Sequence, residues 1–322
     1  RTVWSADFNH DGTRILTASE DGTAWLWDLR GEALALLDNH GWAVRQAVFS
    51  PDGEHILTAS DDGTPRLWGS DGRLLGELEG HLGAVRLVRF SPDGERFVTA
   101  GYDFNARLWD VEGNFLAPLS GHSGRITSLV FSQDGERILT AGEDGTARLW
   151  DEDGNLLLVL EGHTGSLNSA NFNPQGNRVV TASSDGTARL WDVSVELEAD
   201  ADGSLITTLG GHTDAVLWAG FSPDGSRIAT ISQDGTTRLW NAGGSFLTAF
   251  EGHTGPILSA SFNPEGGRIA TAGEDGIARV WKIYTSVEEM LTEAANRLTR
   301  SLTDAECEQY LHLDECSNIK SE

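Results

Sequence analysis

One tryptophan recurs at a nearly constant interval along most of this 322-residue chain. The spacing is 41 residues in five of the six intervals and 49 in the other, and the positions are Trp27, Trp68, Trp109, Trp150, Trp191, Trp240 and Trp281. Self-similarity at a fixed period is the signature of an architecture built from stacked or radially repeated units. The sequence therefore predicts seven copies of one supersecondary unit.

Three further residue types keep the same phase as this tryptophan. Histidine recurs at His40, His81, His122, His163, His212 and His253. Aspartate recurs at Asp21, Asp62, Asp103, Asp144, Asp185, Asp234 and Asp275. Threonine recurs at Thr17, Thr58, Thr99, Thr140, Thr181, Thr230 and Thr271. Six units carry all four residue types, and the phase places the histidine of the first unit before Arg1.

With these residues the chain resembles the WD-repeat β-propeller family over residues 1 to 282, as in GHTGSLNSANFNPQGNRVVTASSDGTARLWD from Gly162 to Asp192. The resemblance implies an all-β fold, a seven-bladed propeller of four-stranded antiparallel blades. It also implies a structural tetrad in each unit, in which aspartate bonds histidine and threonine links histidine to the indole N–H. Such bonding is needed because each orphaned buried polar group costs about 1 to 3 kcal/mol.

Within each unit, short strand-like segments alternate with turn signals, as in AVRLVRF, SPDG, RFVTAG and ARLWD between residues 84 and 110. This alternation predicts a four-stranded meander. Asp-Gly pairs recur at the first and second turns, because both residues tolerate the positive φ of tight hairpin loops. The third unit departs from this pattern, since Phe104 follows Asp103 at its second turn.

The charge of the chain excludes several partner classes. A formal net charge of −26 and a pI near 4.5 repel nucleic acids and anionic membrane surfaces. Arginine does recur two residues before the closing tryptophan, at Arg66, Arg107, Arg148, Arg189, Arg238 and Arg279. With one such arginine in each unit but the first, where Trp25 stands, and with acidic turns nearby, we predict ion pairing within the blades and no basic patch.

Neither a membrane span nor a reactive site is indicated by the sequence. No apolar run approaches the roughly 20 residues of a membrane span, and no leader peptide opens the chain. The two cysteines, Cys307 and Cys316, lie outside the repeats, which fits a reducing, cytoplasmic setting. Phosphate-cradling and nucleophile-elbow motifs are missing, and the three histidines outside the tetrad share no phase. We therefore expect no cofactor and no catalytic or metal-binding residues.

Residues 283–322 are predicted to form a helical C-terminal extension to a propeller domain at 1–282. Val287, Met290, Leu291, Ala294 and Leu298 make an apolar stripe at helical spacing. No outer strand is therefore expected where the seventh unit needs one. Either upstream residues supply that strand or the KIYTS segment at 282–286 does; otherwise the seventh blade keeps an open edge.

The run RLTRSLTDAECEQYL is similar to a tail that follows the last repeat in some bacterial multidomain signalling proteins, although Cys307 stands where tryptophan is typical. In those proteins an NTPase, a protein kinase or a caspase-like protease precedes the propeller. The resemblance implies an upstream effector domain in the same parent chain. Because the first histidine is expected before Arg1, we also expect this chain to be part of a longer protein.

The longer interval places an acidic insertion at residues 193–204. Glu198, Asp200, Asp202 and Gly203 fall at positions 1, 3, 5 and 6 of a calcium loop. Leu209, however, occupies position 12, where a bidentate glutamate belongs. A solvated acidic loop is the preferred interpretation, and calcium binding stays open as an alternative.

Positions that vary while the tetrad stays constant point to a binding surface. In the family, the loops after the Gly-His pair and the turns holding the tetrad aspartate form the top face. There we predict partner-binding residues at Trp4, Trp42, Arg45, Arg86, Tyr102, Arg125, Thr127, Asn168, Leu217 and Leu258. Aromatic side chains and arginines are the residue types that most often dominate protein interfaces.

Together these features predict a recognition or sensor module that presents its top face to a protein or peptide. Its partners would be that ligand and the upstream effector domain, with no nucleic acid and no membrane. A constitutive scaffold is the alternative within the same class. A symmetry-broken propeller hydrolase or a calcium-binding module remains as an alternative from another class.

Overall fold

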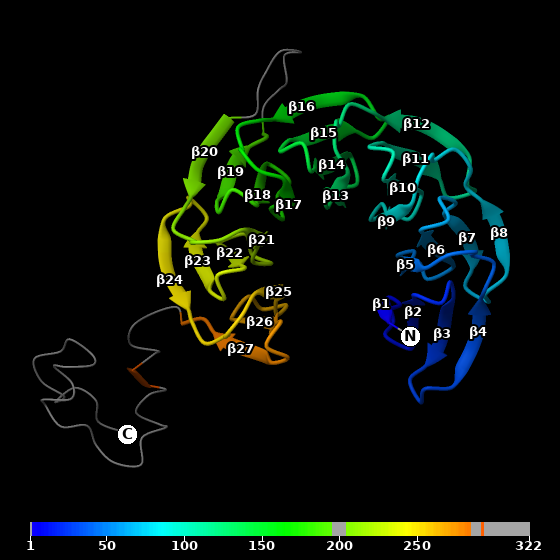
Figure 1. The fold of residues 1–322 in the computed structure, drawn as a ribbon, viewed down its shortest axis with the longest axis horizontal. Coiled ribbons are helices and arrows are strands. Elements are labelled where there is room, and N and C mark those ends of the chain that lie inside the picture. Colours follow the sequence, from blue (N-terminus) through cyan, green and yellow to red (C-terminus); the bar gives the residue numbers. More distant parts are fainter. Residues whose placement is uncertain (1, 195–203, 285–290, 293–322) are drawn as a thin grey trace, which may run out of the picture.

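The computed structural model describes residues 2–194, 204–284 and 291–292. Its strands form seven antiparallel sheets arranged around a common centre (Figure 1). In each blade the chain moves outward strand by strand, so that the first strand lines the centre and the last described strand lies toward the rim. The predicted all-β, seven-bladed propeller is confirmed.

The first four blades are complete. Blade 1 contains β1 (Val3–Phe8), β2 (Arg14–Ser19), β3 (Ala24–Asp28) and β4 (Ala33–Leu37). Blade 2 contains β5 (Val44–Phe49), β6 (His55–Ser60), β7 (Arg66–Gly69) and β8 (Leu74–Glu77). Blade 3 contains β9 (Val85–Phe90), β10 (Arg96–Gly101), β11 (Ala106–Asp110) and β12 (Phe115–Leu119). Blade 4 contains β13 (Ile126–Phe131), β14 (Arg137–Gly142), β15 (Ala147–Asp151) and β16 (Leu156–Leu160).

Among the last three blades, the seventh differs in its strand number. Blade 5 contains β17 (Leu167–Phe172), β18 (Arg178–Ser183), β19 (Ala188–Asp192) and β20 (Ser204–Leu209). Blade 6 contains β21 (Val216–Phe221), β22 (Arg227–Ser232), β23 (Thr237–Asn241) and β24 (Phe246–Phe250). Blade 7 contains β25 (Ile257–Phe262), β26 (Arg268–Gly273) and β27 (Ala278–Lys282). The part of the chain that the structure describes therefore provides three strands for this blade.

The outer strand that the seventh blade lacks would come after its closing tryptophan. The outer strand of each complete blade follows the closing tryptophan of that blade, as β4 follows Trp27. After Trp281, the N–H of Ile283 donates to the carbonyl of Gly267 at 2.9 Å, as the equivalent Ala242 donates to Ser226 in the complete blade 6. Residues 285–290, to which the alternative closure by KIYTS extends, lie outside the described residues. Of the predicted helical extension at 283–322, only residues 283–284, which are not helical, and the helical Leu291 and Thr292 are described. The acidic calcium-loop residues 198–203 also lie outside the described residues.

Tight turns connect the strands in the way that the Asp-Gly pairs predict. Gly135 in the first hairpin of blade 4 has φ of 77°, and Gly145 in the second has φ of 78°. A Cβ at Gly145 would stand 3.2 Å from the carbonyl oxygen of Gly165, so the turn needs glycine for space as well as for φ. Phe104 occupies the equivalent place in blade 3 and adopts φ of 65°, a left-handed conformation that strains an L-residue.

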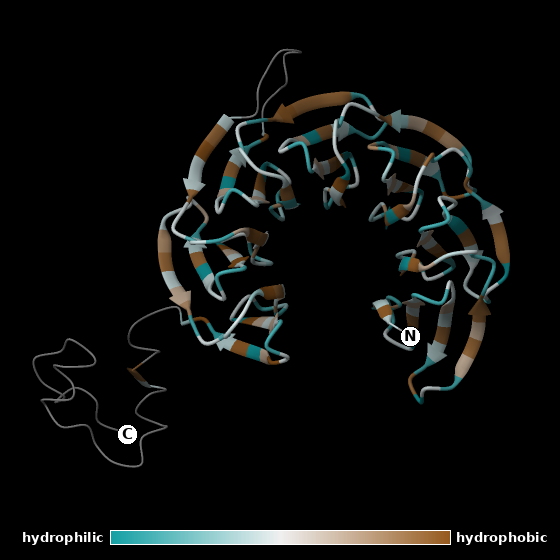
Figure 2. Ribbon diagram, viewed as in Figure 1, coloured by the Kyte–Doolittle hydropathy of each residue, from teal (hydrophilic) through white to brown (hydrophobic). Residues whose placement is uncertain are grey.

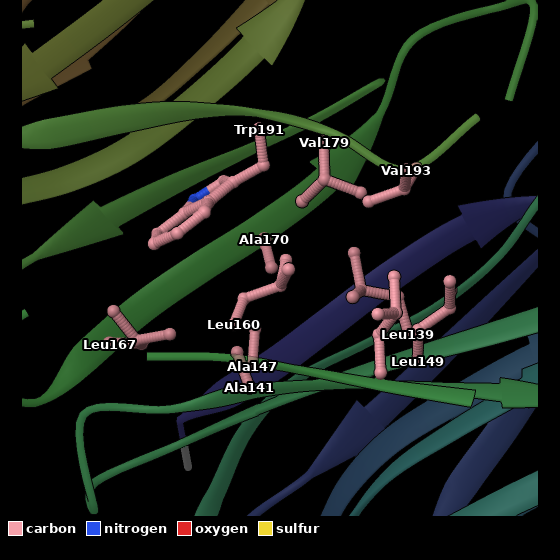
Figure 3. Packing of buried hydrophobic residues seen from close by; sticks show 11 residues of the cluster. Leu139, Ala141, Ala147, Leu149, Leu160, Leu167, Ala170, Val179, Trp191 and Val193 are labelled. Carbon is pink, nitrogen blue, oxygen red and sulfur yellow. The ribbon is translucent and has the colours of Figure 1, made fainter. Parts of the chain in front are cut away.

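The core consists of apolar layers between neighbouring blades. Between blades 4 and 5, Leu139 and Leu149 face Val179 and Trp191, and each is at most 2% exposed (Figure 3). Figure 2 shows hydrophobic segments along the strands, including the outer ones, and many hydrophilic segments in the connecting loops. A blade with a neighbour on each side therefore has both faces buried, and each blade depends on its neighbours for stability.

The two ends of the arc lack such a neighbour. Figure 1 shows the arc open between blade 1 and blade 7. Val280 of blade 7 is 66% exposed, whereas Leu239 at the same strand position of blade 6 is 3% exposed. On the opposite end face, Phe8 of blade 1 is 59% exposed and the equivalent Phe49 of blade 2 is 8% exposed. The apolar pattern therefore continues onto both end faces without being covered there.

Pairing of the repeated arginines is less uniform than the sequence predicts. Nη1 of Arg66 and of Arg279 each lies 2.9 Å from the tetrad aspartate four residues earlier. Arg107 instead donates to the carbonyl of Gly80 at 2.6 Å. The Nε atoms of four of these arginines are buried without a hydrogen-bond partner, namely those of Arg107, Arg148, Arg189 and Arg238. Among the described residues, the predicted ion pair is therefore confirmed for Arg66 and Arg279 and wrong for the arginines of blades 3 to 6.

Candidate functional site

The predicted tetrad residues meet in the middle of each of blades 2 to 7. In blade 4, Nε1 of Trp150 donates to Oγ1 of Thr140 at 3.0 Å, and this oxygen lies 2.9 Å from Nε2 of His122. Nδ1 of His122 is in turn 2.9 Å from Asp144. The same contacts recur with His40, Asp62, Thr58 and Trp68; His81, Asp103, Thr99 and Trp109; His163, Asp185, Thr181 and Trp191; His212, Asp234, Thr230 and Trp240; His253, Asp275, Thr271 and Trp281.

Blade 1 keeps part of this network. Nε1 of Trp27 donates to Oγ1 of Thr17 at 2.8 Å. Asp21 stands in the second turn, where it accepts the backbone N–H of Thr23 at 3.1 Å. The side chains of Thr17 and Trp27 are half-buried here, whereas those of Thr140 and Trp150 are buried.

Burial and hydrogen bonding set the charge states of the network. Burial lowers the pKa of His122, and this effect outweighs the opposite influence of Asp144. Burial by itself raises the pKa of Asp144, but hydrogen bonds from the N–H groups of Ser123 and Thr146, with the nearby imidazole, hold it below its usual range. A neutral imidazole that donates from Nδ1 to a carboxylate and accepts the threonine O–H at Nε2 satisfies both ring nitrogens. These histidines therefore have no free nitrogen with which to bind a metal or act on a substrate.

Acid should destabilise the fold through these groups. In the unfolded chain histidine binds a proton near its ordinary pKa of 6.5, whereas burial keeps the pKa lower in the fold for His40, His81, His122, His163 and His212. The unfolded state therefore takes up more protons, and stability that is complete above pH 6.5 is lost as the pH falls. The tetrad aspartates also lose stability for the fold as the pH falls below 3.8, because the pKa of Asp185 and of Asp234 is lowered to about 2 in the fold.

We expect the free energy of unfolding, measured by denaturant titration at a series of pH values, to decrease steadily as the pH falls below 6.5. A free energy that stays constant or increases on acidification would show that the histidines are not held neutral.

Stacked and paired side chains follow the top end of the inner strands from blade 1 to blade 4. The guanidinium carbon of Arg45 lies 4.5 Å from the ring centre of Trp4. Nε of Arg45 donates to Asp61 at 2.8 Å, and Asp61 accepts a second bond from Nε of Arg86 at 3.1 Å. One carboxylate therefore orients two arginines from neighbouring blades.

Tyr102, directly before the tetrad aspartate of blade 3, extends this arrangement. The guanidinium carbons of Arg86 and Arg125 lie 4.7 and 4.1 Å from the centre of its ring. Nη1 of Arg125 is 3.9 Å from a carboxylate oxygen of Glu143, too far for a hydrogen bond. We call the following six residues the arginine-aromatic ladder: Trp4, Arg45, Asp61, Arg86, Tyr102 and Arg125.

The other predicted top-face residues are placed differently. Oγ1 of Thr127 donates to the carbonyl of Leu167 at 2.6 Å, and Nδ2 of Asn168 donates to the carbonyl of Val216 at 2.8 Å. Both side chains thus link one blade to the next. Leu217 is half-buried, and Leu258 is 59% exposed on incomplete blade 7. The predicted face therefore has two parts. The ladder on blades 1 to 4 presents its side chains at the surface, whereas Thr127 and Asn168 form hydrogen bonds within the protein.

Exposed apolar side chains lie on the loops beside the ladder. Trp42, in the loop after His40, is 69% exposed. Leu82 is 92% exposed, and its N–H donates to Asp103 at 3.2 Å, which holds its loop against the turn that carries Tyr102. Sequence reasoning missed Leu82. An alignment of the units contains the signal, because the next four units place serine or threonine at this loop position.

A groove of about 610 Å³ opens at the other end of the inner strands. Its lining includes Asp7 and Arg89, and burial raises the pKa of Asp7 and lowers that of Arg89. The charges of Asp7 and Arg89 are opposite and interact with each other. This pair therefore adds little net charge to the groove. Within the described ranges, no three histidine, cysteine or acidic side chains are grouped to hold a metal ion, and no helix is long and apolar enough to cross a membrane.

Comparisons with known proteins agree with the repeat pattern. The family described as "WD domain, G-beta repeat" (WD40) matches residues 1–28, 31–69, 72–110, 113–151, 154–192, 203–241 and 244–282. Among solved structures, the crystal structure of the computationally designed Ika8 protein is similar, with a TM-score of 0.76 and 26% sequence identity over 87% of this chain and 83% of that chain. No curated protein matches significantly. The chain belongs to the WD40 repeat family.

Proposed function

We propose that this propeller is a recognition or sensor module that binds a protein or peptide on its top face. WD40 propellers are typically non-enzymatic interaction modules. The observation that carries the proposal is the arginine-aromatic ladder, which concentrates exposed or half-exposed binding groups on one face of blades 1 to 4. Interfaces draw most of their binding energy from a few such aromatic and arginine side chains.

The setting of this module is part of the proposal. We propose that it acts in the cytoplasm of a bacterium, downstream of an effector domain in the same parent chain, with residues 1–282 as the propeller and 283–322 as a helical extension. Ligand binding on the top face would then release or impose a constraint on the effector. Support comes from the similarity of the C-terminal run and from the network in each blade, which keeps the presenting surface rigid.

A sensor and a constitutive scaffold predict different results in the parent chain. Removing residues 1–282 should change the basal activity of the effector if the propeller is a sensor. The same deletion leaves that activity unchanged if the propeller only holds a complex together. Turnover of a substrate by the isolated propeller would contradict both readings and favour an enzyme.

The binding face is tested by substitutions on two surfaces. Changing Trp42 to Ala together with Arg86 to Glu should weaken binding of the captured partner at least about 30-fold, because each removes a side chain of the hot-spot type. The matched control, Leu75→Ala with Arg73→Glu on the outer edge of blade 2, should leave the affinity unchanged. Equal affinity of both variants, measured by titration with the partner and with unchanged melting temperatures, would overturn the top-face assignment.

A further inference from the structure

The ladder carries more positive charge than its own carboxylates balance. Arg45 and Arg86 share the single carboxylate of Asp61, and Glu20 also lies close enough to Arg45 to act on its charge. Arg125 is about half exposed, and its ion pair with Glu143 spans 3.9 Å. This positive site lies on a chain whose net charge is −26. It therefore favours a ligand with a negative group at this point.

Several guanidinium donors at the ladder are free to bind that group. Arg86 uses Nε for Asp61, and no hydrogen bond within the described residues occupies its two Nη atoms. Arg125 has no hydrogen bond to the described residues at any of its nitrogens. Because both stack on Tyr102, their guanidinium carbons lie within about 9 Å of each other, the sum of their distances to the ring centre.

The free donors of these two arginines lie beside the ring of Tyr102. A carboxylate hydrogen-bonded to a guanidinium places its carbon roughly 4 Å from the guanidinium carbon. Two such contacts span roughly 8 Å, whereas the two guanidinium carbons reach their upper limit of about 9 Å only with the ring directly between them. A carboxylate that bridges them therefore binds at the edge of the Tyr102 ring. Stacking on Tyr102 and the bond from Arg86 to Asp61 orient the groups before the ligand arrives, which reduces the entropy lost on binding.

Charge at long range restricts this ligand further. A net charge of −26 repels a polyanion well before it reaches the ladder. A single acidic side chain in an otherwise neutral segment meets far less repulsion. Two exposed apolar side chains lie on the same top edge of blade 3, namely Leu82, which is 92% exposed, and Phe104, which is 41% exposed. An apolar side chain of the ligand, next to its acidic one, can pack against them. Phe104 is also the residue in the strained left-handed conformation, a feature that concentrates at ligand sites.

We propose that the top of blades 3 and 4 binds a peptide segment in which one acidic side chain stands beside a large apolar one. The carboxylate bridges Arg86 and Arg125 at the ring of Tyr102, and the apolar side chain covers Leu82. This inference rests on the proposed function and specifies the ligand class of the same face.

The test uses random peptides displayed on phage as the probe. They are selected on the whole chain, on the variant with Arg86→Glu and Arg125→Glu, and on a control with Arg30→Glu and Arg73→Glu. Both variants change the net charge equally, and the control positions are exposed turn residues after β3 and β7. We expect the chain and the control to enrich peptides with Asp or Glu beside a large apolar residue, and the ladder variant to lose them.

Titration of an enriched peptide then separates the contributions. Changing its acidic residue to the amide should weaken binding at least about 10-fold, and the ladder variant should bind the original peptide at least about 30-fold more weakly. Arg125→Lys should retain part of the affinity, since the charge remains while the planar donors are lost. A polyglutamate chain should bind more weakly than the single-acid peptide.

Other results overturn the inference in distinguishable ways. Enriched peptides without an acidic residue, or acidic peptides that bind the ladder variant equally well, would refute the ligand class while top-face recognition still stands. Tighter binding when phosphoserine replaces the acidic residue would assign the site to phosphopeptides instead. If no peptide is enriched on the unmodified chain, the ligand class and the proposed peptide recognition both fail.

Discussion

Replacing Leu149 by alanine is expected to lower the free energy of unfolding by about 2 to 5 kcal/mol. Leu149 is fully buried in the apolar layer between blades 4 and 5, in the same cluster as Val179 and Trp191 (Figure 3). Truncation removes apolar contacts and leaves a cavity that the surrounding strands fill only in part, because each is fixed by its ladder of hydrogen bonds. Denaturant titration with a two-state fit measures the change.

The repeat supplies a matched control for this prediction. In blade 7, Val280 occupies the strand position that Leu149 occupies in blade 4, and it is 66% exposed. Val280→Ala should therefore change the free energy of unfolding by no more than about 0.5 kcal/mol. A loss at Val280 as large as the loss at Leu149 would mean that the open end face is covered in solution, and the arc would then be closed.

Replacing Thr140 by valine is expected to cost about 2 to 6 kcal/mol, although the side chain keeps its shape. The hydroxyl of Thr140 accepts the indole N–H of Trp150 and lies 2.9 Å from Nε2 of His122. Its removal orphans two buried polar groups, and each orphan costs about 1 to 3 kcal/mol. The loss should appear as a lower denaturation midpoint with an unchanged denaturant slope, because the surface exposed on unfolding stays the same.

Blade 1 provides the comparison, since Thr17 is half-buried and bonds Trp27 without a histidine among the described residues. Thr17→Val should cost only about 1 kcal/mol, because water reaches the indole N–H that loses its partner. Equal losses at Thr17 and Thr140 would argue against the histidine as the second partner of the hydroxyl.

The binding face was only partly predictable. Residues 45, 86 and 102 are placed on one face by their phase within the repeat. Their pairing depends on the distance between neighbouring blades, which no single unit encodes. Asp61 therefore emerges as the link between Arg45 and Arg86 only in the assembled fold. For the same reason, Thr127 and Asn168 share the phase of the arginines yet bond the backbone of the next blade.

The sequence by itself determined the number of blades and their order, and its resemblance to the WD-repeat family implied the partners within the tetrads. These follow from residues that recur at a fixed distance in the chain, because a local meander places the same positions together in every copy. The tertiary structure alone decided which faces are covered, which arginines are paired and where positive charge remains. Those properties depend on contacts between different blades, and the ends of the arc, where Phe8 and Val280 are exposed, show that the same residue pattern is buried only when a neighbouring blade packs against it.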